Sequence, residues 1–70
     1  MTDYEGWQIS NTVSLSENIR LAVEMYIRKH GTPPDILETP LKDIPLPEGM
    51  NIVTRWINLP KNILLVGKVE

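Results

Sequence analysis

The amino-acid sequence predicts an α+β fold, in which one amphipathic helix packs on a small, mostly antiparallel sheet of three or four strands that ends in a C-terminal β-hairpin. Three observations predict it. Apolar residues recur at spacings of three and four between residues 14 and 30, two segments near the C-terminal end are rich in β-branched residues, and proline and glycine separate these segments. A length of 70 residues leaves room for one small domain, residues 1–70.

The predicted core is small. Hydrophobic residues make up 41% of the sequence, which is enough for the chain to fold. The scaling of surface with mass leaves only about three-fifths of the chain's surface buried on folding at this size. A domain this small without a disulfide or a metal needs another source of stability, and association with a second copy is one of the usual answers.

The helix is predicted over residues 14–30. Ser14 and Glu17 have the S-x-x-E spacing of a capping box, with Ser16 as a competing cap. Gly31 suits the left-handed position after the last turn, and the two prolines that follow it prevent continuation. The side chains expected to face the sheet are Leu15, Ile19, Ala22, Val23, Tyr26 and Ile27.

The remaining segments predict the sheet and its connections. Residues 35–39 form a short β-favouring segment, predicted as an edge strand that ends at Pro40. Residues 40–50 carry three prolines and form a packed connection. Residues 51–59 and 63–69 are the two members of the expected hairpin. Residues 1–13 form either a short strand or an arm that covers the sheet.

Composition excludes several classes of function. The chain contains no cysteine, which removes disulfides, thiolate nucleophiles and cysteine-based metal sites. A net charge of −2 has the wrong sign for phosphate-backbone binding, so nucleic acid is disfavoured as a partner. The acidic N-terminal stretch does not resemble a signal peptide, and no apolar run approaches the roughly 18 residues of a membrane span. We therefore expect a cytoplasmic protein with no membrane partner.

No arrangement of residues typical of catalysis or ligand binding is found. His30 lies at the predicted helix end, where a charged imidazole interacts favourably with the helix dipole. The carboxylate pairs Asp35 with Glu38 and Asp43 with Glu48 fall in polar, proline-rich surroundings, where they are expected to be solvated. The glycines are too dispersed for a phosphate-binding loop. We therefore predict a non-enzymatic protein with no catalytic residue, cofactor, metal site or small-molecule ligand.

The apolar residues of the two C-terminal strands do not follow the pattern of a sheet that is covered on one face only. A single helix covers only one face of a sheet, yet both C-terminal strands carry large apolar residues on both faces. The second face needs a cover, which is the N-terminal arm, the proline-rich connection or a second copy of the chain. We predict a homodimer or another protein partner, bound through an apolar sheet face or an unpaired edge strand. The predicted interface residues are Ile52, Trp56, Leu64 and Val66.

Two alternative functions rank below this one. The first is a small acidic regulator or inhibitor that covers a basic surface on a partner protein, using Asp3, Glu5 and Glu17, since no base precedes residue 20. The second is a weak single-stranded nucleic-acid binder that uses Arg55 and Trp56, because an aromatic ring on a sheet can stack on bases.

Overall fold

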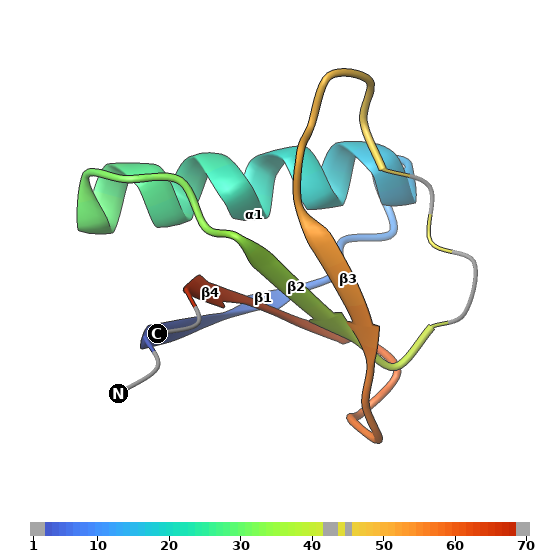
Figure 1. Cartoon of the computed structure of the whole chain (residues 1–70). Helices are drawn as coiled ribbons and strands as arrows, with labels where there is room; N and C mark the ends of the chain where they lie inside the picture. The colour runs from blue at the N-terminus through green and yellow to red at the C-terminus, as the bar shows by residue number, and fades with distance from the viewer. Residues whose placement is uncertain (1–2, 42–43, 45, 69–70) are drawn as a thin grey trace.

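The computed structural model describes residues 3–41, 44 and 46–68, and shows one helix packed against one face of a four-stranded mixed sheet (Figure 1). The predicted α+β class is confirmed. The elements in chain order are β1 (Asp3–Gln8), α1 (Leu15–His30), β2 (Ile36–Thr39), β3 (Val53–Trp56) and β4 (Ile63–Lys68). Within the first thirteen residues, Asp3–Gln8 form the strand β1.

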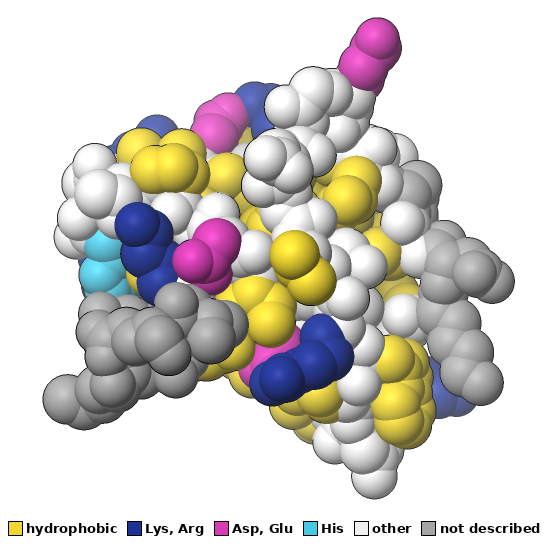
Figure 2. All heavy atoms as spheres, in the orientation of Figure 1, with side chains coloured by type: hydrophobic (Ala, Val, Ile, Leu, Met, Phe, Trp, Pro, Cys, Tyr) yellow, Lys and Arg dark blue, Asp and Glu magenta, His cyan; other side chains and the backbone are white. Residues whose placement is uncertain are grey.

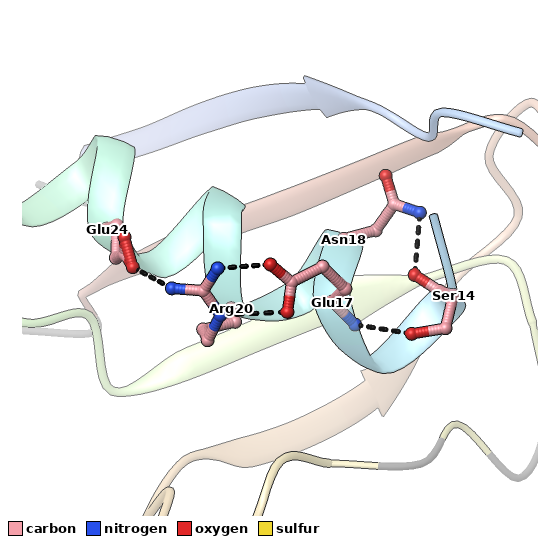
Figure 3. A network of polar contacts seen from close by, with 5 residues as sticks. All are labelled: Ser14, Glu17, Asn18, Arg20 and Glu24. Carbon is pink, nitrogen blue, oxygen red and sulfur yellow. Dashed lines mark hydrogen bonds and ion pairs between the residues drawn. The ribbon is translucent and has the colours of Figure 1, made fainter. Parts of the chain in front are cut away.

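Both ends of α1 follow the local signals in the sequence. Ser14 is the N-cap, and its hydroxyl oxygen accepts a hydrogen bond from the Glu17 N–H at 3.1 Å (Figure 3). Gly31 ends the helix with a φ of 79°, and its N–H donates to the carbonyl oxygen of Ile27 at 2.7 Å. The Glu17 carboxylate binds Arg20, whose guanidinium also contacts Glu24.

The strand order is β1-β4-β2-β3, so the predicted C-terminal hairpin is wrong. The strand β4 is antiparallel to both β1 and β2, whereas β3 is parallel to β2 and does not pair with β4. The chain returns from the end of β2 to the start of β3 through a connection whose Ile44, Leu46 and Met50 pack against the core. Because β2 lies between them, β3 and β4 are separated although they are close in sequence.

The position of β2 corrects a second prediction. Residues 35–39 were expected to form an edge strand, but β2 is an interior strand with all four residues buried. Pro40 follows the strand and so removes no hydrogen bond from its ladder. Two adjacent apolar residues, Ile36 and Leu37, point to opposite faces of the sheet, and both are buried.

The core lies between α1 and one face of the sheet. Paired residues on neighbouring strands share a face, so the register assigns each side chain to the helix side or to the outer side. Glu5 and Trp7 of β1 lie on the helix side, in register with Val66 and Leu64. The buried core residues are Ile19, Ala22, Val23, Tyr26, Leu37, Ile52, Leu64 and Val66.

Candidate functional site

The strand β3 is the most exposed strand of the sheet. All four of its residues are exposed, whereas all four residues of its neighbour β2 are buried. Val53 is 66% exposed and Trp56 is 53% exposed, and both are large apolar side chains. Since β3 ends the strand order, it has β2 as its one neighbour in the sheet (Figure 1).

Half of the backbone groups of β3 point to the side away from β2, where no hydrogen bond to another residue of the described ranges is found. The N–H of Val53 donates to Asp35 at 3.1 Å, and the N–H of Ile57 donates to Thr39 at 3.0 Å. Successive residues of a strand turn their N–H and C=O groups to alternate sides. The N–H and C=O groups of Thr54 and Trp56 therefore point outward, and we call these two residues the free edge.

A charged pair lies beside the free edge, on the outer face of the sheet. The Glu38 side chain is only 7% exposed, while Arg55 in register with it on β3 is 60% exposed. The Arg55 Nε donates to Glu38 Oε2 at 2.8 Å, and Nη2 contacts the same oxygen. The hydrogen bond to Glu38 raises the pKa of Arg55. The guanidinium of β3 therefore lies against an acidic side chain of the neighbouring strand.

Hydrophobic side chains surround this pair. Figure 2 shows hydrophobic side chains gathered over the part of the sheet formed by β2 and β3, with a basic and an acidic side chain in contact among them. By the register, Ile36, Val53 and Tyr4 lie on this outer face. Burial raises the pKa of Tyr4, and the negative charge of Glu38 raises it further.

The four predicted interface residues do not share one exposed surface. Ile52, Leu64 and Val66 are buried in the core that faces the helix. Trp56 alone is exposed, and its indole N–H donates to the Pro40 carbonyl oxygen at 3.0 Å. The sequence shows large apolar residues on both faces of the C-terminal strands, but it does not show which face the helix covers. Sequence reasoning left Val53 out of the interface, although it is the most exposed large apolar residue that the structure describes.

Among the side chains that the structure describes, those named for the two alternative functions do not form the surfaces that those functions need. Arg55 and Trp56 are successive residues of β3, so their side chains lie on opposite faces and do not form one binding surface. Glu5 contacts Lys29 and His30, and Glu17 contacts Arg20, so these two carboxylates are neutralised within the chain. The side chain of Asp3 lies outside what the structure describes.

The histidine takes part in a contact between β1 and the end of α1. His30 Nε2 lies 2.9 Å from Glu5 Oε2, and the Lys29 Nζ donates to Glu5 Oε1 at 3.0 Å. The imidazole ring stacks on Tyr26 with 4.3 Å between ring centroids. The hydrogen bonds from His30 and then Lys29 lower the pKa of Glu5. This cluster ties the first strand to the helix.

The lowered pKa of Glu5 predicts a loss of stability in acid. A carboxyl group whose pKa is lower in the folded chain than in the unfolded chain stabilises the fold at pH values above its unfolded pKa. This contribution is lost as the pH falls through the folded pKa. We expect the free energy of unfolding to decline below about pH 4.5, the ordinary value for Glu5, with Glu17 contributing through Arg20 in the same range.

Denaturant unfolding at a series of pH values checks this expectation. Glu5→Gln should be less stable than the natural sequence at neutral pH and should show a shallower decline in acid. Glu48→Gln, at an exposed position in a turn, is the matched control and should keep the full decline. Parallel curves for Glu5→Gln and the natural sequence would contradict the assignment.

Other kinds of site are not found in the ranges described. Within residues 3–41, 44 and 46–68, no group of three or more His, Cys, Asp or Glu side chains could hold a metal ion. No helix in this part of the chain has the length and apolar character needed to cross a membrane. Comparison with protein-family models, with curated proteins and with solved structures gives no match.

Proposed function

We propose that the chain is a small non-enzymatic protein-interaction module that self-associates by adding a β-strand to the free edge of β3. The observation that carries this proposal is that the four exposed residues belong to the strand that ends the sheet, with half of its backbone groups facing away from β2. Strand addition is a common mode of protein recognition, in which backbone hydrogen bonds supply affinity and alternate side chains supply specificity.

The side chains of β3 support strand addition. Natural sheets often protect an exposed edge with a charge or a proline. The strand β3 contains no proline, and its one charged residue, Arg55, is matched by Glu38 on β2. Val53 adds apolar surface on one face of the sheet and Trp56 adds it on the other face. A partner strand would bury part of this surface.

The folded chain has a surface area close to that of a monomeric protein of its mass. The accessible surface of the chain is 4652 Å². A monomeric protein of 8.0 kDa has an accessible surface of roughly 4,450 Å² by the usual scaling. The chain is therefore about as compact as an independent monomer, and the proposal concerns association between chains that are already folded.

A pair of matched lysine variants tests the proposal. Val53→Lys places a charge on the edge strand, where lysine opposes pairing, at a side chain that is already exposed. Val13→Lys makes the same change at an exposed position before the helix. In light scattering on a size-exclusion column, Val53→Lys should remain monomeric at concentrations where Val13→Lys and the natural sequence associate. Equal association of the two variants would overturn the assignment to β3.

A further inference from the structure

We infer that the second copy binds antiparallel across a two-fold axis at Arg55, so that the two β3 strands join both sheets into one. This inference rests on the proposed self-association and adds its partner strand, direction and register. A two-fold axis brings the same surface of both copies together and closes the assembly as a dimer. Pairing β3 with the β1 edge of another copy would instead leave further edges open, which leads to filaments.

The backbone fixes the register. With the axis at Arg55, Thr54 of one copy lies opposite Trp56 of the other, and both residues have outward N–H and C=O groups. Each such pair can exchange two hydrogen bonds, as opposed residues do at the hydrogen-bonded positions of an antiparallel ladder. An axis at Thr54 or at Trp56 would pair one free-edge residue with a position outside β3. The axis at Arg55 is therefore the register that uses the whole free edge.

Charge and shape agree with this register. The two Arg55 side chains would lie opposite each other on the outer face, where like charges alone destabilise a strand pair. Each Arg55 is held by Glu38 of its own copy, so the row across the joined sheet reads Glu, Arg, Arg, Glu and has no net charge. Val53 would lie opposite Ile57 of the other copy on that face. Trp56 would lie beside the short side chain of Thr54 on the opposite face.

Cysteine cross-linking tests the register, because the chain contains no cysteine of its own. The Cα atoms of opposed residues at a hydrogen-bonded position are about 5.5 Å apart, within the range that a disulfide spans. Two copies of the same residue, Thr54 with Thr54 or Trp56 with Trp56, would be about 8 Å apart, which is too far. Mixing Thr54→Cys with Trp56→Cys and oxidising should therefore give mostly the mixed disulfide, well above the half expected from random pairing.

The replacement of Trp56 can itself weaken association, so a second pair of variants tests the same register with Trp56 intact. Val53→Cys and Ile57→Cys are opposed in the same register, at a non-hydrogen-bonded position where the Cα atoms are about 4.5 Å apart. Mixed disulfides in either pair support the register. A predominance of same-residue disulfides, or a dimer that forms none of these cross-links, would overturn the register while self-association stands. A monomeric mass for the natural sequence at all concentrations would overturn the proposed function itself.

Discussion

Replacing Leu64 with alanine is expected to lower the free energy of unfolding by about 2–5 kcal/mol, the usual loss for a fully buried leucine. Leu64 is 0% exposed and belongs to β4, which lies between β1 and β2 and faces the helix. A domain of 70 residues has a total stability of roughly 3.5–10 kcal/mol, so the variant should lose a large part of it. Chemical denaturation followed by tryptophan fluorescence measures the change.

Leu65→Ala is the matched control, since it removes the same atoms from the next residue of the same strand. Leu65 lies on the outer face and is only partly buried, so its replacement should cost less than half as much. The comparison also distinguishes the core position of Leu64 from the interface position that the sequence predicted. Replacing a core residue lowers the stability of the monomer, so the loss is also expected at low protein concentration. Equal losses for the two variants would show that the helix does not cover the face assigned to Leu64.

Asn18→Ala is expected to lower the free energy of unfolding by about 2–4 kcal/mol, because several backbone and indole groups would lose their partner. Asn18 is 1% exposed and lies in the first turn of α1. Its Oδ1 accepts from the Ser10 N–H at 2.8 Å and from the Trp7 indole N–H at 3.2 Å. Its Nδ2 donates to the carbonyl oxygen of Ser10 at 3.0 Å. It also donates to that of Ser14 at 2.9 Å (Figure 3). The side chain thus fixes β1 and the connection after it to the helix.

The control for this variant is Asn51→Ala, at an exposed asparagine before β3. Its effect should stay within about 0.5 kcal/mol, as is usual for surface substitutions. Thermal unfolding of both variants at neutral pH gives the comparison. A melting temperature for Asn18→Ala that matches that of Asn51→Ala would mean that solvent replaces the hydrogen bonds of Asn18 at no cost.

The helix was predictable because its signals are local. The cap at Ser14 and the stop at Gly31 depend on residues within one turn, and both act as the sequence indicates. Strand pairing depends on contacts far apart in sequence, and propensity does not encode the partner. The two segments after residue 50 looked like a hairpin because they are close in the chain. In the structure β2 instead pairs with β4 on one side and with β3 on the other, so it separates these two segments.

The candidate site was predictable only in part, for a related reason. The sequence showed large apolar residues on both faces of its last strands, and one of the two alternatives that it offered was an edge strand. Which face receives the helix is decided by the register of the whole sheet. That register buries Leu64 and Val66 and leaves Val53 and Trp56 exposed. The identity of the free edge followed once β2 was placed between β3 and β4.

The mass of the natural sequence in solution, measured by light scattering over a series of protein concentrations, tests self-association through β3 most directly. We expect the mass to rise from 8.0 kDa toward twice that value as concentration increases. The rise should change little between low and moderate salt, because backbone hydrogen bonds and apolar contacts are screened less than surface charges. A mass that stays at 8.0 kDa up to the highest soluble concentration would contradict the account.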